Sequence, residues 1–210
     1  MGLFHTGKEQ QDRAYNEMMI PVRKRLSDAD IFRLASNAGG CVSGTGDQIL
    51  LETFGRQVAV HVPDGEITPA LESWHALVLL HYILNADAVP PTGRWRSFED
   101  MKDGLIRGTK FSGSSARWFE RFLKGRQLGQ VEAACLALGG ERARGRGDIN
   151  VRIPFFPHFP VLVSLWEADE DFDAAGKILL DGNADHYLTI EDAVTAGEII
   201  QKRIEMQLVK

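Results

Sequence analysis

The segment PALESWHALVLLHYILN, residues 69–85, is apolar on nearly every side when it is drawn as a helix. Thr68 and Pro69 are typical of its start, as a hydroxyl N-cap and a proline at the first helical position. The run VPPTG, residues 89–93, ends it. A helix without a polar face is not stable on a surface, so other elements must surround it. We therefore expect the chain to fold around a central buried helix.

The residues before this helix alternate between apolar and polar, with the period of two that is typical of strands. Residues 48–54 and 56–62 predict two antiparallel strands hinged at Gly55. Residues 41–43 are expected to add a short strand before them. These elements form the first part of a sheet.

The second half of the chain contains both kinds of element. Residues 161–166 form an almost continuous apolar run, which is typical of a strand buried on both faces. Further strands are expected at 150–156 and 177–180, and helices at 114–124, 128–138 and 189–207. Strands and helices do not alternate, so the sequence predicts an α+β fold. In it, mostly antiparallel sheets pack against the central buried helix and a C-terminal helix.

The N-terminal part predicts a separate helical element. Residues 8–26 have an amphipathic pattern, and a second helix is expected to start at Ser27, in a capping-box pattern, and to end at a Gly-Gly pair. We expect an N-terminal helical arm over residues 1–26 and a single α+β domain over residues 27–210. The arm could contact a partner or a second copy through residues 8–26.

Composition excludes several classes of protein. The longest apolar stretch, residues 76–84, is too short to span a bilayer, and the N-terminus has no apolar signal region, so a cytoplasmic location is expected. Cys41 and Cys135 are too few for a four-thiolate metal site. Basic residues are concentrated in residues 93–147, but nucleic-acid binding needs a longer basic face with exposed aromatics and is not expected.

Two stretches near the C-terminus carry carboxylates at alternate positions. Asp181, Asn183 and Asp185 fit the first three ligand positions of a calcium loop, with Asp192 at the twelfth. His186 stands where such a loop needs glycine, and Thr189-x-x-Asp192 also fits a helix capping box. The earlier stretch, with acids at positions 169, 171 and 173, lacks the closing carboxylate. The pattern favours turns beside core strands over a cation site.

Glu167 follows Trp166 at the end of the predicted buried strand. A carboxylate in that position is expected to be partly desolvated, which would raise its pKa and make it a candidate for chemistry. Together with His158 and His186 it would complete a two-histidine, one-carboxylate metal set. The alternative is that histidines from separate turns do not meet, since no spacing motif joins them.

The central helix carries two histidines, His75 and His81, that do not share a face. His81 falls in line with apolar residues, which predicts a core histidine bonded to a backbone carbonyl or to the sheet. A lone buried histidine on an apolar helix is also what a tetrapyrrole metal uses as a ligand.

Several segments together carry a family resemblance: LLHYILNA at 79–86, WRSF at 95–98, LWEADEDF at 165–172, ILLD at 178–181 and HYLTIED at 186–192. Their order resembles an uncharacterised family of bacterial and archaeal proteins, frequent in anaerobes and known only as a domain of unknown function. The resemblance runs from Ser27 to Gln207 and draws attention to Glu167 and to the His186-Tyr187 pair. Some relatives carry an attached four-cysteine iron–sulfur module, which this chain lacks.

Two functional hypotheses follow. The first is a non-enzymatic ligand-binding or accessory protein of anaerobic cofactor or redox metabolism, with an unidentified small-molecule ligand or protein partner. Its pocket would lie between the sheet and the central helix, and the candidate residues are His81, Tyr82, Glu167, His186 and Tyr187. The second is a hydrolase-like or metal-dependent enzyme that uses Glu167 with His186 or His158. The sequence identifies no cofactor.

Overall fold

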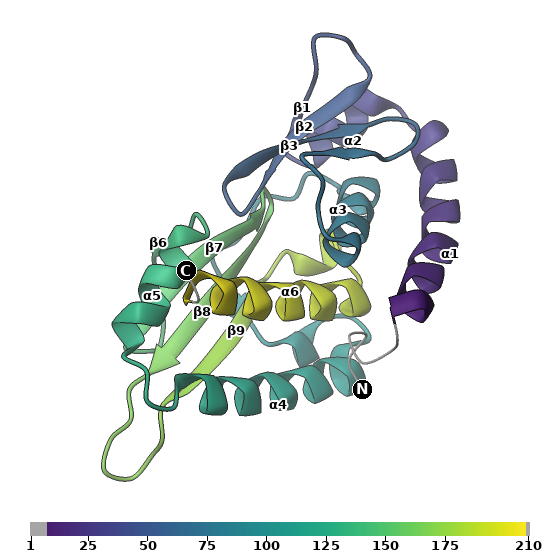
Figure 1. Ribbon diagram of the computed structural model, residues 1–210. Coiled ribbons are helices and arrows are strands. Elements are labelled where there is room, and N and C mark those ends of the chain that lie inside the picture. Colours follow the sequence, from purple (N-terminus) through teal and green to yellow (C-terminus); the bar gives the residue numbers. More distant parts are fainter. Residues whose placement is uncertain (1–7, 209–210) are drawn as a thin grey trace.

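The computed structural model describes residues 8–208, with side chains for residues 13–208. This part of the chain contains six α-helices and two antiparallel sheets, one of four strands and one of five. The predicted α+β fold with mostly antiparallel pairing is confirmed. In Figure 1 the smaller sheet lies at one end of the molecule, and the larger sheet forms the other end together with three of the helices.

The five-stranded sheet has the order β5-β9-β8-β7-β6. Its strands are β5 (Trp95–Arg96), β6 (Glu141–Arg142), β7 (Ile149–Phe156), β8 (Phe159–Trp166) and β9 (Ala175–Asp181). The central strand, β8, is buried from its first residue to Leu165, which confirms the strand predicted to be buried on both faces. The β7–β8 register shifts between Ile153 and Phe156, and this irregularity accommodates Pro154, which has no N–H for the ladder.

The smaller sheet confirms the predicted hairpin. Its strands, in spatial order, are β1 (Cys41–Val42), β2 (Gln48–Thr53), β3 (Arg56–His61) and β4 (Ile67–Thr68). Gly55 has a φ of +66° at the β2–β3 turn, a conformation that glycine adopts without steric strain. The backbone N–H of Phe54 donates to the carbonyl of Pro154 over 3.0 Å and so joins this hairpin to β7.

The central helix, α3 (Ser73–Asn85), is buried from Trp74 to Leu80 and again at Tyr82 and Ile83. The predicted start at Thr68-Pro69 is wrong. Thr68 belongs to β4, where it pairs with Ala59, and the N-cap position of α3 is Glu72. Tertiary pairing of the backbone with the small sheet has overridden a local helix-start pattern.

Three further helices cover one face of the five-stranded sheet, as Figure 1 shows. They are α4 (Gly104–Leu123), α5 (Leu128–Ala137) and α6 (Ile190–Leu208). The helix α4 begins ten residues earlier than the predicted Ser114, because Gly104 and Gly108 pack directly on the backbone of Phe98. A Cβ at either glycine would lie within 2.5 Å of the Phe98 carbonyl oxygen, so glycines replace the apolar side chains that periodicity detects. No helix within residues 8–208 combines the length and the hydropathy needed to cross a membrane.

The helix α1 (Lys8–Ser27) confirms the helix predicted over residues 8–26, and it lies along α3 with Met19, Val22 and Leu26 buried. The second helix does not start at Ser27. Instead α2 (Ile31–Asn37) is capped by Asp30, whose side chain accepts hydrogen bonds from the first helical N–H groups. Residues 1–7 of the expected arm, and residues 209–210 of the expected domain, lie outside the described part of the chain. The division into arm and domain stays a prediction.

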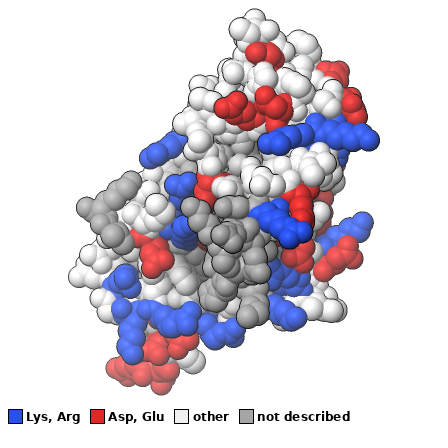
Figure 2. Space-filling view, turned by 45° about the vertical axis from the view of Figure 1, so that its right-hand side comes forward, with Lys and Arg blue, Asp and Glu red and all other residues white. Residues whose placement is uncertain are grey.

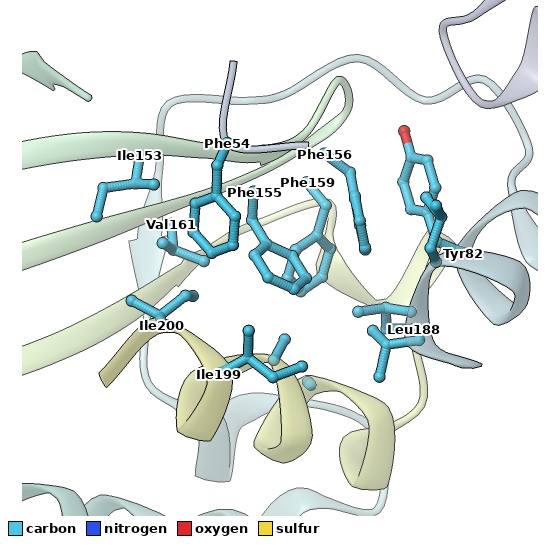
Figure 3. Close-up of a cluster of buried hydrophobic side chains, with 14 of the residues drawn as sticks. Phe54, Tyr82, Ile153, Phe155, Phe156, Phe159, Val161, Leu188, Ile199 and Ile200 are labelled. Carbon is cyan, nitrogen blue, oxygen red and sulfur yellow. The ribbon is translucent and has the colours of Figure 1, made fainter. Parts of the chain in front are cut away.

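An aromatic cluster fills the space between α3, α6 and the end of the five-stranded sheet (Figure 3). Phe155, Phe156 and Phe159 are almost fully buried there, and the rings of Phe155 and Phe156 are 4.3 Å apart. Tyr82 of α3 packs 4.6 Å from the Phe156 ring. The pocket that we expected between the sheet and the central helix is therefore occupied by side chains of the core.

Candidate functional site

The candidate residues of the sequence analysis fall at two opposite ends of β8. His158 precedes this strand and Glu167 follows it, and eight extended residues span about 26 Å. The ring of Tyr187 lies 5.8 Å from that of His158, so the His186-Tyr187 pair belongs to the His158 end. The structure does not bring Glu167 together with either histidine.

Glu167 is exposed, which corrects the expectation that it is desolvated. The strand ends at Trp166, and residues 167–174 form a hairpin that projects into solvent (Figure 1). Asp169 accepts hydrogen bonds from the backbone of Asp171 and Phe172 at 2.9 and 2.8 Å, so it stabilises the hairpin turn. The prediction of an exposed acidic turn is confirmed for this first carboxylate stretch.

Tyr82 is a structural residue at the other end. Its hydroxyl donates to the carbonyl of Ala38 over 2.7 Å and accepts from the backbone N–H of His158 over 3.0 Å. It therefore joins the end of α2 to the β7–β8 turn. Burial raises the pKa of Tyr82 well above its usual range, so the phenol stays protonated and keeps donating.

We expect Tyr82→Phe to lower the free energy of unfolding by about 1–3 kcal/mol, because it leaves a buried carbonyl and a buried N–H without their partner. Urea denaturation at neutral pH measures this. Tyr15→Phe is the matched control, since the Tyr15 hydroxyl has no hydrogen-bond partner among the described residues, and we expect a change below about 0.5 kcal/mol. Equal losses for the two variants would contradict the structural role of the Tyr82 hydroxyl.

Tyr187 and Asn183 hold the loop that follows α3. The Tyr187 hydroxyl donates to the carbonyl of Val89 over 2.5 Å, and burial raises the pKa of Tyr187 to about 12. The Asn183 amide donates to the carbonyls of Val89 and His158 at 3.0 and 2.9 Å. Tyr187 also stacks on Tyr82 with a ring separation of 5.2 Å. These contacts organise the backbone around the loop.

The second carboxylate stretch is not a set of solvated turns, because Asp181 is only 1% exposed. Its Oδ1 accepts from the Thr92 N–H, the Thr92 hydroxyl and the Asn183 N–H, at 2.8, 2.9 and 3.1 Å. Its Oδ2 accepts from the Gly93 N–H over 2.7 Å. The donors point their positive ends at the oxygens that a cation would need, so Asp181 fixes the loop before β5 instead.

The other two carboxylates of this stretch also face protein donors. Asp185 forms an ion pair with Arg96 at 2.8 Å and accepts from the Lys102 N–H at 3.0 Å. The Asp192 N–H donates to the Thr189 hydroxyl over 3.3 Å, as the capping-box pattern predicts, and the Asp192 carboxylate accepts from that hydroxyl over 2.8 Å and contacts His81. The side chains that fit calcium positions therefore point to separate partners.

His81 is not the core histidine. It is partly exposed, and its Nδ1 lies 2.8 Å from Asp192 Oδ1, so it joins α3 to the start of α6. The core histidine is His75, which is 1% exposed and has its Nε2 2.8 Å from the Thr53 hydroxyl. His186 forms a surface pair with Asp87 at 2.7 Å.

A pocket that the sequence analysis missed lies on the open face of the five-stranded sheet. The covered face is marked by Gly176, where a Cβ would lie 2.3 Å from the Phe119 ring of α4. Gly176 pairs with Leu165, so both face α4. Side chains alternate along each strand, so the preceding and following residues in β8 and β9 point to the open face. The pocket on this face has a volume of about 450 Å³ and is lined by Trp95, Arg146, Leu162, Trp166, Lys177 and Leu179, among others.

The floor of the pocket is a pair of leucines that face each other across β8 and β9, Leu162 and Leu179. The next rung along the strands pairs Ser164 with Lys177. The Trp166 indole closes one side, where its N–H donates to the carbonyl of Arg146 over 3.2 Å. An apolar floor with a few polar groups above it is typical of small-molecule sites, and the volume is within their usual range.

A larger hollow of about 730 Å³ lies between the α4–α5 loop and the base of the acidic hairpin. Its lining mixes acidic and basic side chains, including Glu120, Arg121, Lys124 and Glu167, and contains no aromatic residue. Figure 2 shows acidic side chains gathered at the lower end of the molecule with Lys and Arg directly above them. The lining carries charges of both signs and has no aromatic surface to select a ligand, so the hollow is a weaker candidate than the pocket on the sheet.

The family model described as Domain of unknown function (DUF3786) matches residues 30–203. The chain belongs to the DUF3786 family. The match begins at the N-cap of α2, so the DUF3786 region leaves out α1 and contains all the residues that line the sheet pocket. No curated protein and no solved structure matches the chain.

The pocket residues of this DUF3786 domain come from three separate segments, at Trp95, at Arg146 and in the β8–β9 hairpin. No motif spacing joins them, which is why the sequence analysis did not select them. One local signal was present, because Ser164 and Trp166 interrupt the aliphatic side chains on one face of β8. Both polar groups have partners within the protein, since the Ser164 hydroxyl donates to Asn150 and the Trp166 N–H to the carbonyl of Arg146.

Proposed function

We propose that this protein binds a small molecule in the pocket on the open face of the five-stranded sheet, and that it acts by binding and not by catalysis. The proposal is carried by one observation, the apolar floor of Leu162 and Leu179 beside two indoles, on a face that no helix of residues 8–208 covers. Strands form most of the pocket, so its shape is preorganised and little ordering would oppose binding. Such a protein would suit the accessory role in cofactor metabolism that the sequence resemblance implied.

The enzyme hypothesis receives less support from the geometry. It required Glu167 to cooperate with His158 or His186 within hydrogen-bond reach or through one water. The length of β8 separates Glu167 from His158. The histidines that pair with carboxylates, His61, His81 and His186, pair with other residues than Glu167. The hydrogen bonds of Tyr82 and Tyr187 go to backbone carbonyls of neighbouring loops, so both phenols are used to hold the fold.

Leu179→Trp tests the proposed function, because an indole in place of the half-exposed Leu179 fills the pocket floor. In a thermal-shift screen of a small-molecule library, we expect compounds that stabilise the wild type to leave Leu179→Trp unchanged. A ligand at a hundred times its Kd adds about 2.7 kcal/mol of stability, which is about 5–10 °C in Tm for a chain of this size.

Ile106→Trp is the matched control, since it places an indole at an exposed apolar position of α4, where Ile106 is 70% exposed. It should respond to the same compounds as the wild type. If every stabilising compound acts equally on the wild type and on Leu179→Trp, the pocket is not the binding site and the proposal fails.

A further inference from the structure

We infer that the ligand of the sheet pocket is a planar aromatic anion, an inference that rests on the proposed function. The pocket offers two kinds of recognition on one flat surface. The indoles and Leu179 present apolar surface to a ring system, and basic side chains at the rim present positive charge to an acidic substituent.

The positive charge comes from Arg146 and Lys177. The Lys177 ammonium donates to the Ser97 hydroxyl over 2.8 Å, and no ion pair of the described side chains includes Lys177 or Arg146. A third cation at the rim, Arg96, is already paired with Asp185 at 2.8 Å. Two basic groups therefore border the pocket without a carboxylate within 4 Å to neutralise them.

The nearby carboxylates have other partners. Asp100 also borders the pocket, and its carboxylate accepts from the Ser97 N–H over 3.0 Å in a capping box. Glu99 accepts from the Ser112 hydroxyl over 2.6 Å, and the charge of Lys177 is among the influences that lower its pKa. The pocket lining holds three basic side chains, Arg96, Arg146 and Lys177, against the single carboxylate of Asp100, so its charge is positive on balance and an anion gains from it.

The preference for a flat ring follows from the register of the strands. Asp181, Leu179, Lys177 and Ala175 follow one another along the open face of β9. Trp95 of β5 lies opposite Asp181 at one end of this row, and Trp166 of β8 lies opposite Ala175 at the other end. Same-face residues are about 7 Å apart along a strand, so the leucine floor lies between an indole at each end. Aromatic rings gain from stacking on indoles and from flat contact with leucines, and a branched aliphatic ligand gains less.

A matched pair of fluorescent probes tests this inference. 8-Anilinonaphthalene-1-sulfonate and N-phenyl-1-naphthylamine share one aromatic skeleton, and only the first carries a negative charge. We expect one saturable site for the sulfonate on the folded protein, with a Kd at least about tenfold lower than that of the uncharged probe. Leu179→Trp should abolish the signal from both probes.

Lys177→Met removes the charge and keeps the length of the side chain. We expect it to weaken sulfonate binding at least about fivefold and to change binding of the uncharged probe less than about twofold. Lys110→Met on the exposed surface of α4 is the control for a general loss of positive charge, and it should change neither affinity.

The outcomes separate the inference from the proposed function. If both probes bind with equal affinity and Lys177→Met changes neither, the anionic character is refuted and the binding pocket stands. If neither probe binds, or if both bind Leu179→Trp as tightly as the wild type, the pocket itself is refuted and the inference falls with it.

Discussion

Asp181→Ala is expected to lower the free energy of unfolding by about 3–5 kcal/mol, the largest loss that we predict for a single substitution outside the apolar core. The side chain is 1% exposed and accepts four hydrogen bonds, three of them from backbone N–H groups of Thr92, Gly93 and Asn183. Alanine leaves these donors buried without an acceptor. Urea denaturation followed by far-UV circular dichroism measures the loss.

Asp169→Ala is the matched control, because it removes the first aspartate of the other carboxylate stretch. Asp169 also accepts two backbone hydrogen bonds, but it lies in the exposed hairpin where water replaces them. We expect a change below about 1 kcal/mol. A loss at Asp181 no larger than that at Asp169 would contradict the assignment of Asp181 as a buried acceptor. A cation site would instead be indicated if millimolar calcium raised the Tm of the wild type and did not raise that of Asp181→Ala.

The elements that sequence predicted well are those whose burial is uniform. The helix at 73–85 and the strand at 159–166 are apolar on all sides, so pattern alone indicates that both lie in the core. Their interiors and C-terminal ends were predicted correctly, and their starts were not. Pairing of Ile67 and Thr68 with the small sheet moved the helix start, and no local signal reports a partner that is distant in sequence.

Close backbone packing explains why the first half of α4 was not predicted from the sequence. In α4 the residues that face the core near its start are Gly104 and Gly108, and their contribution is the absence of a side chain. Hydrophobic periodicity measures apolar side chains, so a helix that packs through glycine looks like a loop. The N-cap residue of α4, Asp103, has a φ of +60°, a left-handed conformation that aspartate adopts more readily than most residues.

The polar residues show a second limit of prediction from sequence. Alternating carboxylates at 181–185 looked like one site, but the chain turns so that Asp181 points inward and Asp185 toward Arg96. His81 was expected in the core but lies partly exposed beside Asp192, and the buried histidine of α3 is His75, because only neighbouring elements decide which side of the helix has a carboxylate. The sheet pocket needed the register of β8 and β9, which no single-sequence pattern supplies.

The buried histidine leads to the second large prediction, a loss of stability in mild acid. Burial lowers the pKa of His75 to about 4 from an ordinary 6.5, and the positive charge of Arg203 acts in the same direction. The Nδ1 atom has no hydrogen-bond partner among the described residues, so a proton added there would meet no acceptor. The rings of Phe54 and Phe155 surround the imidazole at 5.6 and 5.4 Å, and they cannot solvate a cation as water does.

Above pH 6.5 His75 is neutral in both the folded and the unfolded chain, and its contribution to stability is complete. Between pH 6.5 and about 4 the unfolded chain binds a proton that the folded chain does not, so stability falls as pH falls, by about 3 kcal/mol in total. The comparison is with His75→Gln, which can still bond to Thr53 and does not titrate. His61 and His158, whose pKa values are raised and lowered respectively, are present in both chains and cancel in the difference.

We therefore expect the difference in unfolding free energy between wild type and His75→Gln to shrink by about 2–3 kcal/mol between pH 7.5 and pH 4.5. Urea titrations at several pH values measure it, and the comparison does not depend on what glutamine itself does to packing. A difference that stays constant over this range would mean that water or a carboxylate reaches His75 and shares its proton. The aromatic cluster would then be open at α3, and the assignment of the space between the sheet and the central helix as solid core would have to be abandoned.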